Sequence, residues 1–180
     1  MPYVSIDDLS AGRSVVEYLL SLGRRRIAFI SGPIRYKYAR QRLEGYHDAL
    51  QAAGFEVDPH LIVQLPEVSY DLAISGAMQL LNTAEPPDAF YTTSDVYATA
   101  AIRAAYLAGA RVPQDVMVTG FDNIEFSSMA IPSITTVNQP KMQLGFMACE
   151  LLLEKISYPA TPNKKVMLDT ELIIRESTSI

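Results

Sequence analysis

The segment Asp115-Val-Met-Val-Thr-Gly-Phe-Asp-Asn-Ile-Glu-Phe-Ser-Ser-Met-Ala-Ile-Pro-Ser-Ile-Thr-Thr-Val-Asn-Gln139 decides the fold class. It opens with the short apolar, β-branched run Val116–Thr119, which a glycine ends. A run this short between turn residues is typical of a strand buried on both faces. Ligands of open α/β sheets bind beyond the carboxyl ends of such strands, so Phe121, Asp122 and Asn123 are expected at a ligand-binding edge. An aromatic ring, a carboxylate and an amide suit a small polyhydroxylated or heterocyclic ligand. The competing interpretation is that Asp122 only caps a turn.

Outward from this segment, strands and helices are predicted to alternate. The predicted strands are Tyr3–Ile6, Ile27–Ser31, Leu61–Gln64, Ala89–Thr93 and Val116–Thr119. Helices are predicted after Asp7-Asp8 and over Ala39–Ala53, Tyr70–Leu81 and Tyr97–Leu107. This order predicts an α/β protein with a doubly wound parallel sheet and helices on both faces. Beyond Pro132, a brief strand at Thr135–Val137, a helix over Lys141–Ile156 and one half-exposed closing strand through Val166–Ile174 are expected.

Composition excludes several classes of protein. The chain has 180 residues, of which 49% are hydrophobic and 19% charged, as in a soluble globular domain. Its net charge of -5 creates no general attraction to nucleic acid, and the basic cluster Arg24–Arg26 is interpreted as a solvated corner. Cys149 is the single cysteine, which fits a reducing compartment. No apolar run is long enough to span a bilayer.

Catalytic groups are scarce in the sequence. His47 and His60 are the only histidines, and both are expected at the surface. No Cys or His cluster has metal-binding spacing, and Ser31-Gly32-Pro33 lacks the glycine pattern of a nucleotide-binding loop. The sequence therefore predicts no enzyme, no catalytic residue, no metal site and no cofactor.

Polar groups at strand ends are the main functional signal. Four loops leave carboxyl ends of predicted strands, at Asp7, Ile34–Arg42, Ser94-Asp95 and Phe121–Asn123, and they are expected to meet at one edge of the sheet. Arg42 carries several fixed donors and Asp122 only acceptors, so together they can hold vicinal hydroxyls or the edge of a heterocycle. The alternative is that Arg42 pairs with Asp122 or Glu44 for structural reasons only.

Eight short motifs are distinctive in combination: Val4–Asp8, Leu22–Ala28, Ser31–Pro33, Arg42–Tyr46, Thr93–Asp95, Val112–Val116, Gly120–Asn123 and Pro132–Pro140. Together they resemble the effector-binding domain of the lactose-repressor/galactose-repressor (LacI/GalR) family of bacterial transcription regulators. The resemblance covers essentially the whole chain. It implies a fold like that of type I periplasmic binding proteins, in which two Rossmann-like lobes hold the ligand in the cleft between them.

The resemblance also implies a domain organisation. A helix-turn-helix headpiece, a hinge helix and most of the first lobe are expected to precede Met1. Residues 1–6 are expected to end the first lobe and cross over, and residues 7–136 to form the C-terminal lobe. Residues 137–162 are expected to return to the first lobe, and residues 163–180 to supply the closing strand of the C-terminal lobe and a tail.

Site residues follow from the matched motifs. The ligand contacts that the resemblance implies are Arg42, Asp122, Ser94, Gln139, Tyr36 and Ile6, with Tyr70 in place of an aromatic ring that sugar- and purine-binding members usually offer. The implied dimer contacts are Tyr97, Ala101, Phe126 and Met129. The alternative for the alanine-rich helix is that it simply packs on its own sheet.

The function that the resemblance implies is that of a ligand sensor in a cytoplasmic, homodimeric transcription regulator. A small sugar or nucleoside-like effector shifts the two lobes, and operator DNA binds through the headpiece rather than through this chain. No membrane partner is expected. The alternatives are a periplasmic sugar-binding protein of a transporter and, less favoured, a small α/β enzyme.

Overall fold

The structure, a computed structural model, describes residues 1–179 and has a six-stranded sheet as its main body. The strand order is β3–β2–β4–β5–β6–β8, and the bounds are β2 (Ile27–Ser31), β3 (Ile62–Gln64), β4 (Ala89–Thr92), β5 (Met117–Asp122), β6 (Thr135–Asn138) and β8 (Glu171–Ile173). The first five strands are parallel, and β8 runs antiparallel to β6. The predicted α/β class with a mainly parallel sheet is confirmed.

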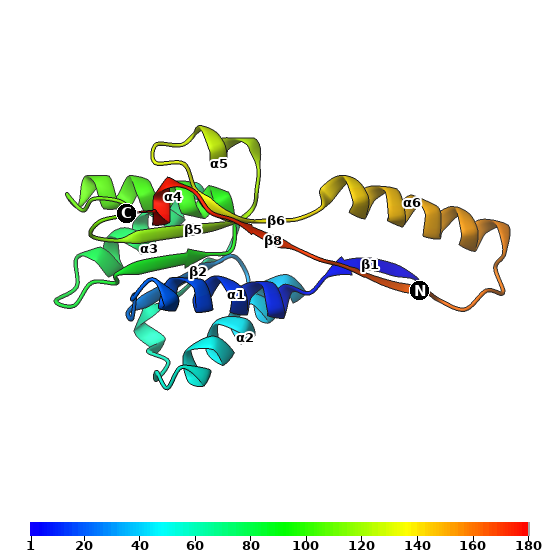
Figure 1. Ribbon diagram of the computed structural model, residues 1–180, viewed down its shortest axis with the longest axis horizontal. Helices are drawn as coiled ribbons and strands as arrows, with labels where there is room; N and C mark the ends of the chain where they lie inside the picture. Colours follow the sequence, from blue (N-terminus) through cyan, green and yellow to red (C-terminus); the bar gives the residue numbers. More distant parts are fainter. Residues whose placement is uncertain (180) are drawn as a thin grey trace.

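Helices cover both faces of this sheet (Figure 1). The helices α1 (Asp8–Ser21) and α2 (Lys37–Ala52) pack on one face, and α3 (Tyr70–Leu81) and α4 (Asp95–Leu107) on the other. Successive strand residues point to opposite sides, so Ala28 and Ile30 join the alanine-rich core under α4, while Phe29 joins an aromatic core under α1. Two short 3-10 helices, η1 (Pro59–Leu61) and η2 (Glu176–Thr178), complete the body.

Helix α1 begins and ends where its sequence signals indicate. The Asp7 carboxylate accepts a hydrogen bond from the Ser10 amide at 3.0 Å, which satisfies one of the free N–H groups of the first turn. Gly23, with a φ of 87°, ends the helix in the left-handed conformation that glycine adopts without steric cost. This start fixes the position of Asp8, the first residue of the helix.

A smaller unit projects from the main body (Figure 1). Strands β1 (Tyr3–Ile6) and β7 (Lys165–Leu168) form a separate two-stranded parallel sheet, and α6 (Lys141–Ser157) lies against β1. We call β1, β7 and α6 the extension. Three connections join it to the body, between β1 and α1, between β6 and α6, and between β7 and β8. Several apolar side chains of α6 are exposed, namely Met142, Phe146, Leu152, Leu153 and Ile156.

The structure corrects two strand predictions. Strand β5 does not end at Gly120 but continues to Asp122, because its pairing with β6 extends to Asn138. Gly120 instead permits the close approach of α4, since a Cβ at this position would collide with the Asp95 carboxylate. The single closing strand is in fact two strands, β7 and β8, since its first half pairs with β1 and its second half with β6. In addition, the segment after Asn123, for which no helix was predicted, contains the short helix α5 (Glu125–Met129).

Candidate functional site

A hollow of about 420 Å³ opens where the body meets the extension. It lies at the carboxyl ends of the parallel strands, where α/β proteins hold ligands. Its lining comprises Val4, Ser5, Ile6, Asp8, Tyr38, Arg42, Thr93, Asp122, Gln139 and Leu144. The expected meeting of the strand-end loops is therefore observed, and we call this hollow the interlobe pocket.

Arg42 is buried at the floor of the interlobe pocket, with only 4% of its surface exposed. Its Nε donates to Asp8 Oδ1 at 2.8 Å, its Nη2 lies 2.7 Å from the same oxygen, and its Nη1 donates to the Thr93 carbonyl at 2.9 Å. The guanidinium carbon also lies 3.4 Å from the centre of the Phe121 ring and 5.0 Å from that of Tyr38. Arg42 thus pairs with Asp8, which corrects the structural alternative of a pair with Asp122 or Glu44.

Asp122 stands opposite, at the end of β5. Its Oδ1 accepts a hydrogen bond from Gln139 Nε2 at 2.5 Å, and its backbone carbonyl accepts one from Lys141 Nζ. Burial raises the pKa of Asp122, while Arg42 and the Gln139 hydrogen bond act in the other direction. Asp122 and Asn123 have φ values of 103° and 50°, a strained backbone for residues other than glycine. Such strain persists only where surrounding contacts hold it, and it is concentrated at functional sites.

Asp95 holds in place the strained loop that contains Asp122 and Asn123. Its carboxylate accepts hydrogen bonds from the Ile124 amide at 2.8 Å and from Thr136 Oγ1 at 2.5 Å. On the other side, Arg175 donates to the Asn123 side chain at 2.9 Å. The loop is therefore positioned by groups that do not themselves line the interlobe pocket.

Burial raises the pKa of Asp95 to about 6 from its ordinary value of 3.8. Because the folded state binds this proton more tightly than the unfolded state, the contribution of Asp95 to stability falls as pH rises from about 4 to about 6. Asp95→Asn removes the titration while its amide can still accept from Ile124. We expect the difference in unfolding free energy between Asp95→Asn and the parent to shift in favour of the variant across this window, as measured by urea unfolding at several pH values. A difference that does not change with pH contradicts the expectation.

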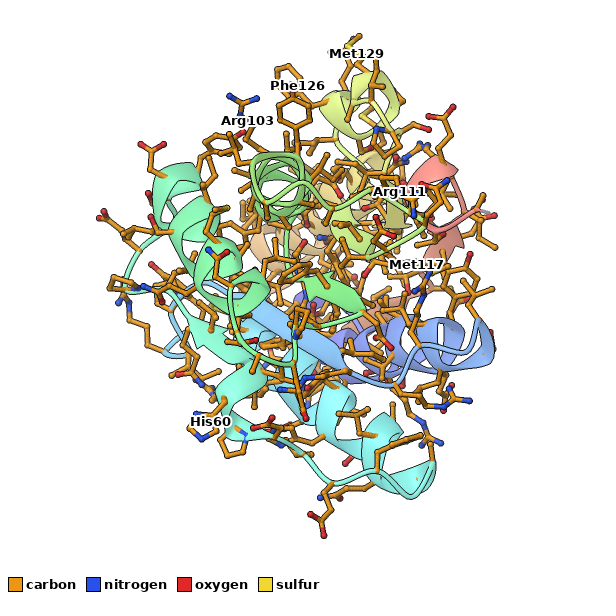
Figure 2. The ribbon with its side chains drawn as sticks, turned by 90° about the vertical axis from the view of Figure 1, so that its left-hand side faces the viewer. His60, Arg103, Arg111, Met117, Phe126 and Met129 are labelled. Atoms are coloured by element: carbon orange, nitrogen blue, oxygen red, sulfur yellow. The ribbon has the colours of Figure 1, made fainter. Side chains whose placement is uncertain are left out.

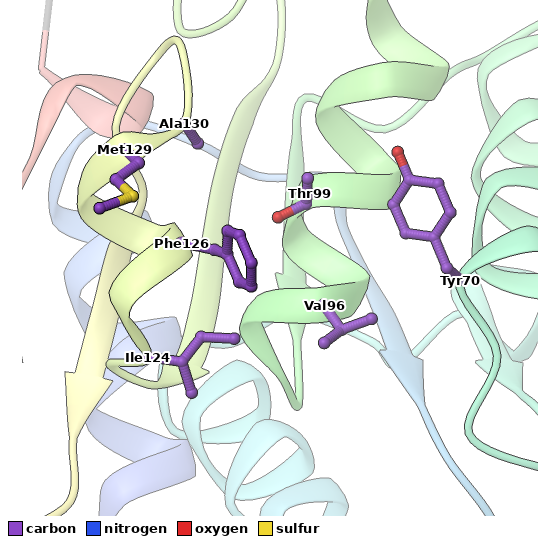
Figure 3. Close-up of a pocket in the computed structure, with 7 residues that line it drawn as sticks. All are labelled: Tyr70, Val96, Thr99, Ile124, Phe126, Met129 and Ala130. Carbon is purple, nitrogen blue, oxygen red and sulfur yellow. The ribbon is translucent and has the colours of Figure 1, made fainter.

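Of the other predicted ligand contacts, Ser94 and Tyr36 lie near the interlobe pocket, whereas Tyr70 does not. Ser94 caps α4, and its side chain acts to lower the pKa of Asp122, so it lies beside the interlobe pocket. Tyr36 is exposed and stacks on Tyr38, which is the ring that lines the pocket. Tyr70 is not brought to this site at all. It lines a second hollow on the far side of α4 (Figure 3), because its helix packs on the face of the sheet that α4 covers.

Sequence reasoning missed six of the residues that line the pocket, namely Val4, Ser5, Asp8, Tyr38, Thr93 and Leu144. A signal was present for two of them. Asp8 adjoins Asp7 at an edge already predicted to bind ligand, and Tyr38 precedes Arg42 by four residues, so both lie on the same side of α2. Thr93 contacts Arg42 through its backbone carbonyl, and a pattern of side chains gives no information about such a contact.

The second hollow has a volume of about 340 Å³ and is mainly apolar, with Tyr70, Val96, Thr99, Ile124, Phe126, Met129 and Ala130 around it (Figure 3). Phe126 and Met129 are 70% and 63% exposed and project from the same end of the molecule (Figure 2). Tyr97 and Ala101, also predicted as dimer contacts, are 2% and 0% exposed. The alanine face of α4 packs on its own sheet, so both side chains are buried within this chain, and their role as dimer contacts stays a prediction.

Residues 1–179 contain neither a candidate metal site nor a helix that could span a membrane. No group of three or more His, Cys, Asp or Glu side chains in this range is placed to hold a metal ion. Within the same residues, no helix has the length and apolar character needed to cross a bilayer. His60, one of the two histidines, is exposed on the body, well away from α5 (Figure 2).

Comparison with known proteins gives consistent matches. The family model of the periplasmic binding protein-like domain matches residues 16–178. The HTH-type transcriptional regulator CelR of Thermobifida fusca is 38% identical over 175 residues, which are 97% of this chain and 51% of that protein. The HTH-type transcriptional repressor CytR of Escherichia coli is 36% identical over 178 residues, 99% of this chain and 52% of that protein. The chain spans about half the length of these curated relatives.

Solved structures agree in fold. The complex of CelR with cellobiose superposes with a TM-score of 0.93 at 37% identity, over 98% of this chain and 54% of that one. A LacI family transcriptional regulator from Enterococcus faecium, with bound ribose, gives a TM-score of 0.86 at 27% identity, over 99% of this chain and 65% of that one.

Proposed function

The chain belongs to the periplasmic binding protein-like domain family, in the form found in LacI-type regulators, and on this premise we propose that it is the sensor part of a transcription regulator. In this proposal, a small sugar or nucleoside-like effector binds in the interlobe pocket and changes the affinity of the whole protein for operator DNA. The protein acts in the cytoplasm and is not an enzyme. The relatives are transcriptional regulators, which favours this function over a transporter's binding protein.

One observation carries the proposal, namely the opposed polar groups of the interlobe pocket. Arg42 and Gln139 supply N–H donors, while Asp8 and Asp122 supply carboxylate acceptors. Tyr38 adds a ring against which a sugar or a base can lie. Binding sites for small polar ligands combine a few fixed donors and acceptors with such a surface.

The extension supports a two-lobe arrangement. We propose that residues 7–136 form one lobe, and that residues 1–6 and 137–162 belong to a second lobe whose remainder is outside this chain. The exposed apolar face of α6 gives that remainder a surface to cover. Since β7 pairs with β1, residues 165–168 go with the second lobe in this proposal, and only β8 and the tail return to the first.

The proposed assembly is a homodimer that reads operator DNA through a headpiece outside this chain. Exposed apolar side chains around the second hollow, Phe126 and Met129, support a contact between two copies at this end. A two-fold dimer is the economical assembly for a near-palindromic operator. Analytical sedimentation of the full-length protein measures its oligomeric state directly.

Asp122→Ala tests the proposed site. Each hydrogen bond between a neutral hydroxyl and a carboxylate contributes about 1.5–3 kcal/mol, so effector affinity should fall by roughly 10- to 150-fold. We propose calorimetry on the full-length protein with neutral sugars and nucleosides, including cellobiose, ribose and cytidine. Asp48→Ala, which removes a carboxylate on the exposed side of α2, is the control and should bind like the parent. Equal affinity of the Asp122→Ala variant and the parent would reject this site.

A further inference from the structure

The interlobe pocket contains two carboxylates that face the same space. Asp8 is only 6% exposed, and Asp122 is half-buried. Both contacts from Arg42 to Asp8 fall on Oδ1, and no described residue donates a hydrogen bond to Oδ2. The free lone pairs of Asp8 therefore remain for a donor that enters the pocket, such as a hydroxyl group.

The guanidinium of Arg42 is already engaged by the protein. Three of its five N–H groups are directed at Asp8 and the Thr93 carbonyl. Phe121 lies against the guanidinium, and the Tyr38 ring lies nearby. Its positive charge is matched at contact distance by Asp8, so Arg42 is not a free receptor for an anion.

Lys141 does not line the pocket, although its charge, like that of Arg42, acts to lower the pKa of Asp122. Its ammonium group is exposed at the rim and donates to the backbone carbonyls of Asp122 and Asn123. The charged side chains that line the pocket are thus Asp8, Asp122 and Arg42, a formal net charge of -1. A phosphate group would meet like charge in a partly desolvated site, whereas a neutral polyol can donate to both carboxylates.

We propose that the interlobe pocket selects uncharged polyhydroxylated effectors against their phosphate esters, and that Asp8 is the residue that sets this preference. The inference rests on the proposed function and narrows its ligand class. Asp8 acts in two ways: it removes Arg42 from anion binding, and it adds a second negative charge to the lining. The specificity comes as much from repulsion of the wrong ligand as from attraction of the right one.

The test compares matched pairs on the full-length protein by calorimetry: ribose with ribose 5-phosphate, glucose with glucose 6-phosphate, and cytidine with cytidine monophosphate. For any pair whose neutral member binds, that member should bind at least about tenfold more tightly than its ester. Asp8→Asn keeps the shape of the side chain and frees Arg42. It should therefore reduce the ratio of the neutral compound's affinity to the ester's affinity by about tenfold or more.

Asp7→Asn is the matched control because it removes the same charge one residue away. The Asp7 carboxylate is exposed, is occupied by the amide and hydroxyl of Ser10, and does not line the pocket. Asparagine caps a helix as well as aspartate does, so α1 should be unaffected. The ratio between neutral and phosphorylated ligand should stay at the parent value in this control.

The outcomes separate this inference from the proposed function. An ester that binds as tightly as its neutral partner overturns the inference, while the sensor function stands. An Asp8→Asn variant with the parent's ratio overturns the role of Asp8. If that variant does not fold, the ratio measured on the parent protein still decides the selectivity. Failure of every compound to bind overturns the proposed function together with the inference.

Discussion

Arg42→Ala is expected to lower the free energy of unfolding by about 3–5 kcal/mol and to abolish effector binding. The loss of stability arises because the variant leaves Asp8, 6% exposed, as a buried carboxylate with no cation beside it. The contact of the guanidinium with the Phe121 ring and its hydrogen bond to the Thr93 carbonyl are lost as well. Chemical unfolding of the full-length protein measures the first effect, and calorimetry with a bound effector the second.

Two further variants separate the effect of Arg42 on stability from its effect on effector binding. Arg40→Ala removes an exposed arginine from the same helix and should change stability by less than about 0.5 kcal/mol. Adding Asp8→Leu to Arg42→Ala removes the uncompensated carboxylate and should restore much of the stability, because a buried ion pair is often replaceable by apolar groups. Effector binding should not return. Recovery of binding in the double variant would show that Arg42 acts only through the fold.

Gly45→Val is expected to destabilise the protein by about 3 kcal/mol, through the contact between α1 and α2. A Cβ at Gly45 would lie within van der Waals overlap of the Leu9 carbonyl oxygen and the Arg13 amide nitrogen, both of which are backbone atoms. The two helices would have to move apart to accommodate the side chain. Since Asp8 is on α1 and Arg42 on α2, this movement should also weaken effector binding.

Gly145→Ala is the matched control for this position. Gly145 also lies inside a helix, α6, but nothing approaches its Cβ position within 4 Å. Alanine has the higher helix propensity, so the control should gain about 0.5–1 kcal/mol. Urea unfolding of both variants gives the comparison. A Gly45→Val protein as stable as the parent would mean that the close helix contact is not required.

The architecture was predictable because the local signals agree with one another. Short buried runs alternate with amphipathic helices, and the start of α1 is marked by Asp7. The same alternation indicates which strand ends meet, so the joint position of Arg42 and Asp122 followed from topology alone. Tyr36 and Tyr38 are two residues apart, and only the packing of α2 decides which ring faces the pocket.

Tertiary contacts decide the features that the sequence does not show. Gly120 was interpreted as the end of a strand, yet it serves the close approach of Asp95, a residue 25 positions away. Tyr97 was predicted as a dimer contact with self-packing of its helix as the alternative, and the structure shows the alanine side of that helix turned toward the sheet. The division of the closing strand at Asp169 depends on two different partner strands, which no local pattern records.

The extension is joined to the body by three separate stretches of backbone, at residues 6–8, 138–141 and 168–171. A single tether would let the two parts swivel freely, whereas three must all bend at once. The relative motion of the extension and the body is therefore expected to be a hinge rotation about one favoured axis. A protease that cuts one of these stretches would leave the body and the extension attached through the other two. The cut would widen the range of their relative motion without releasing a fragment.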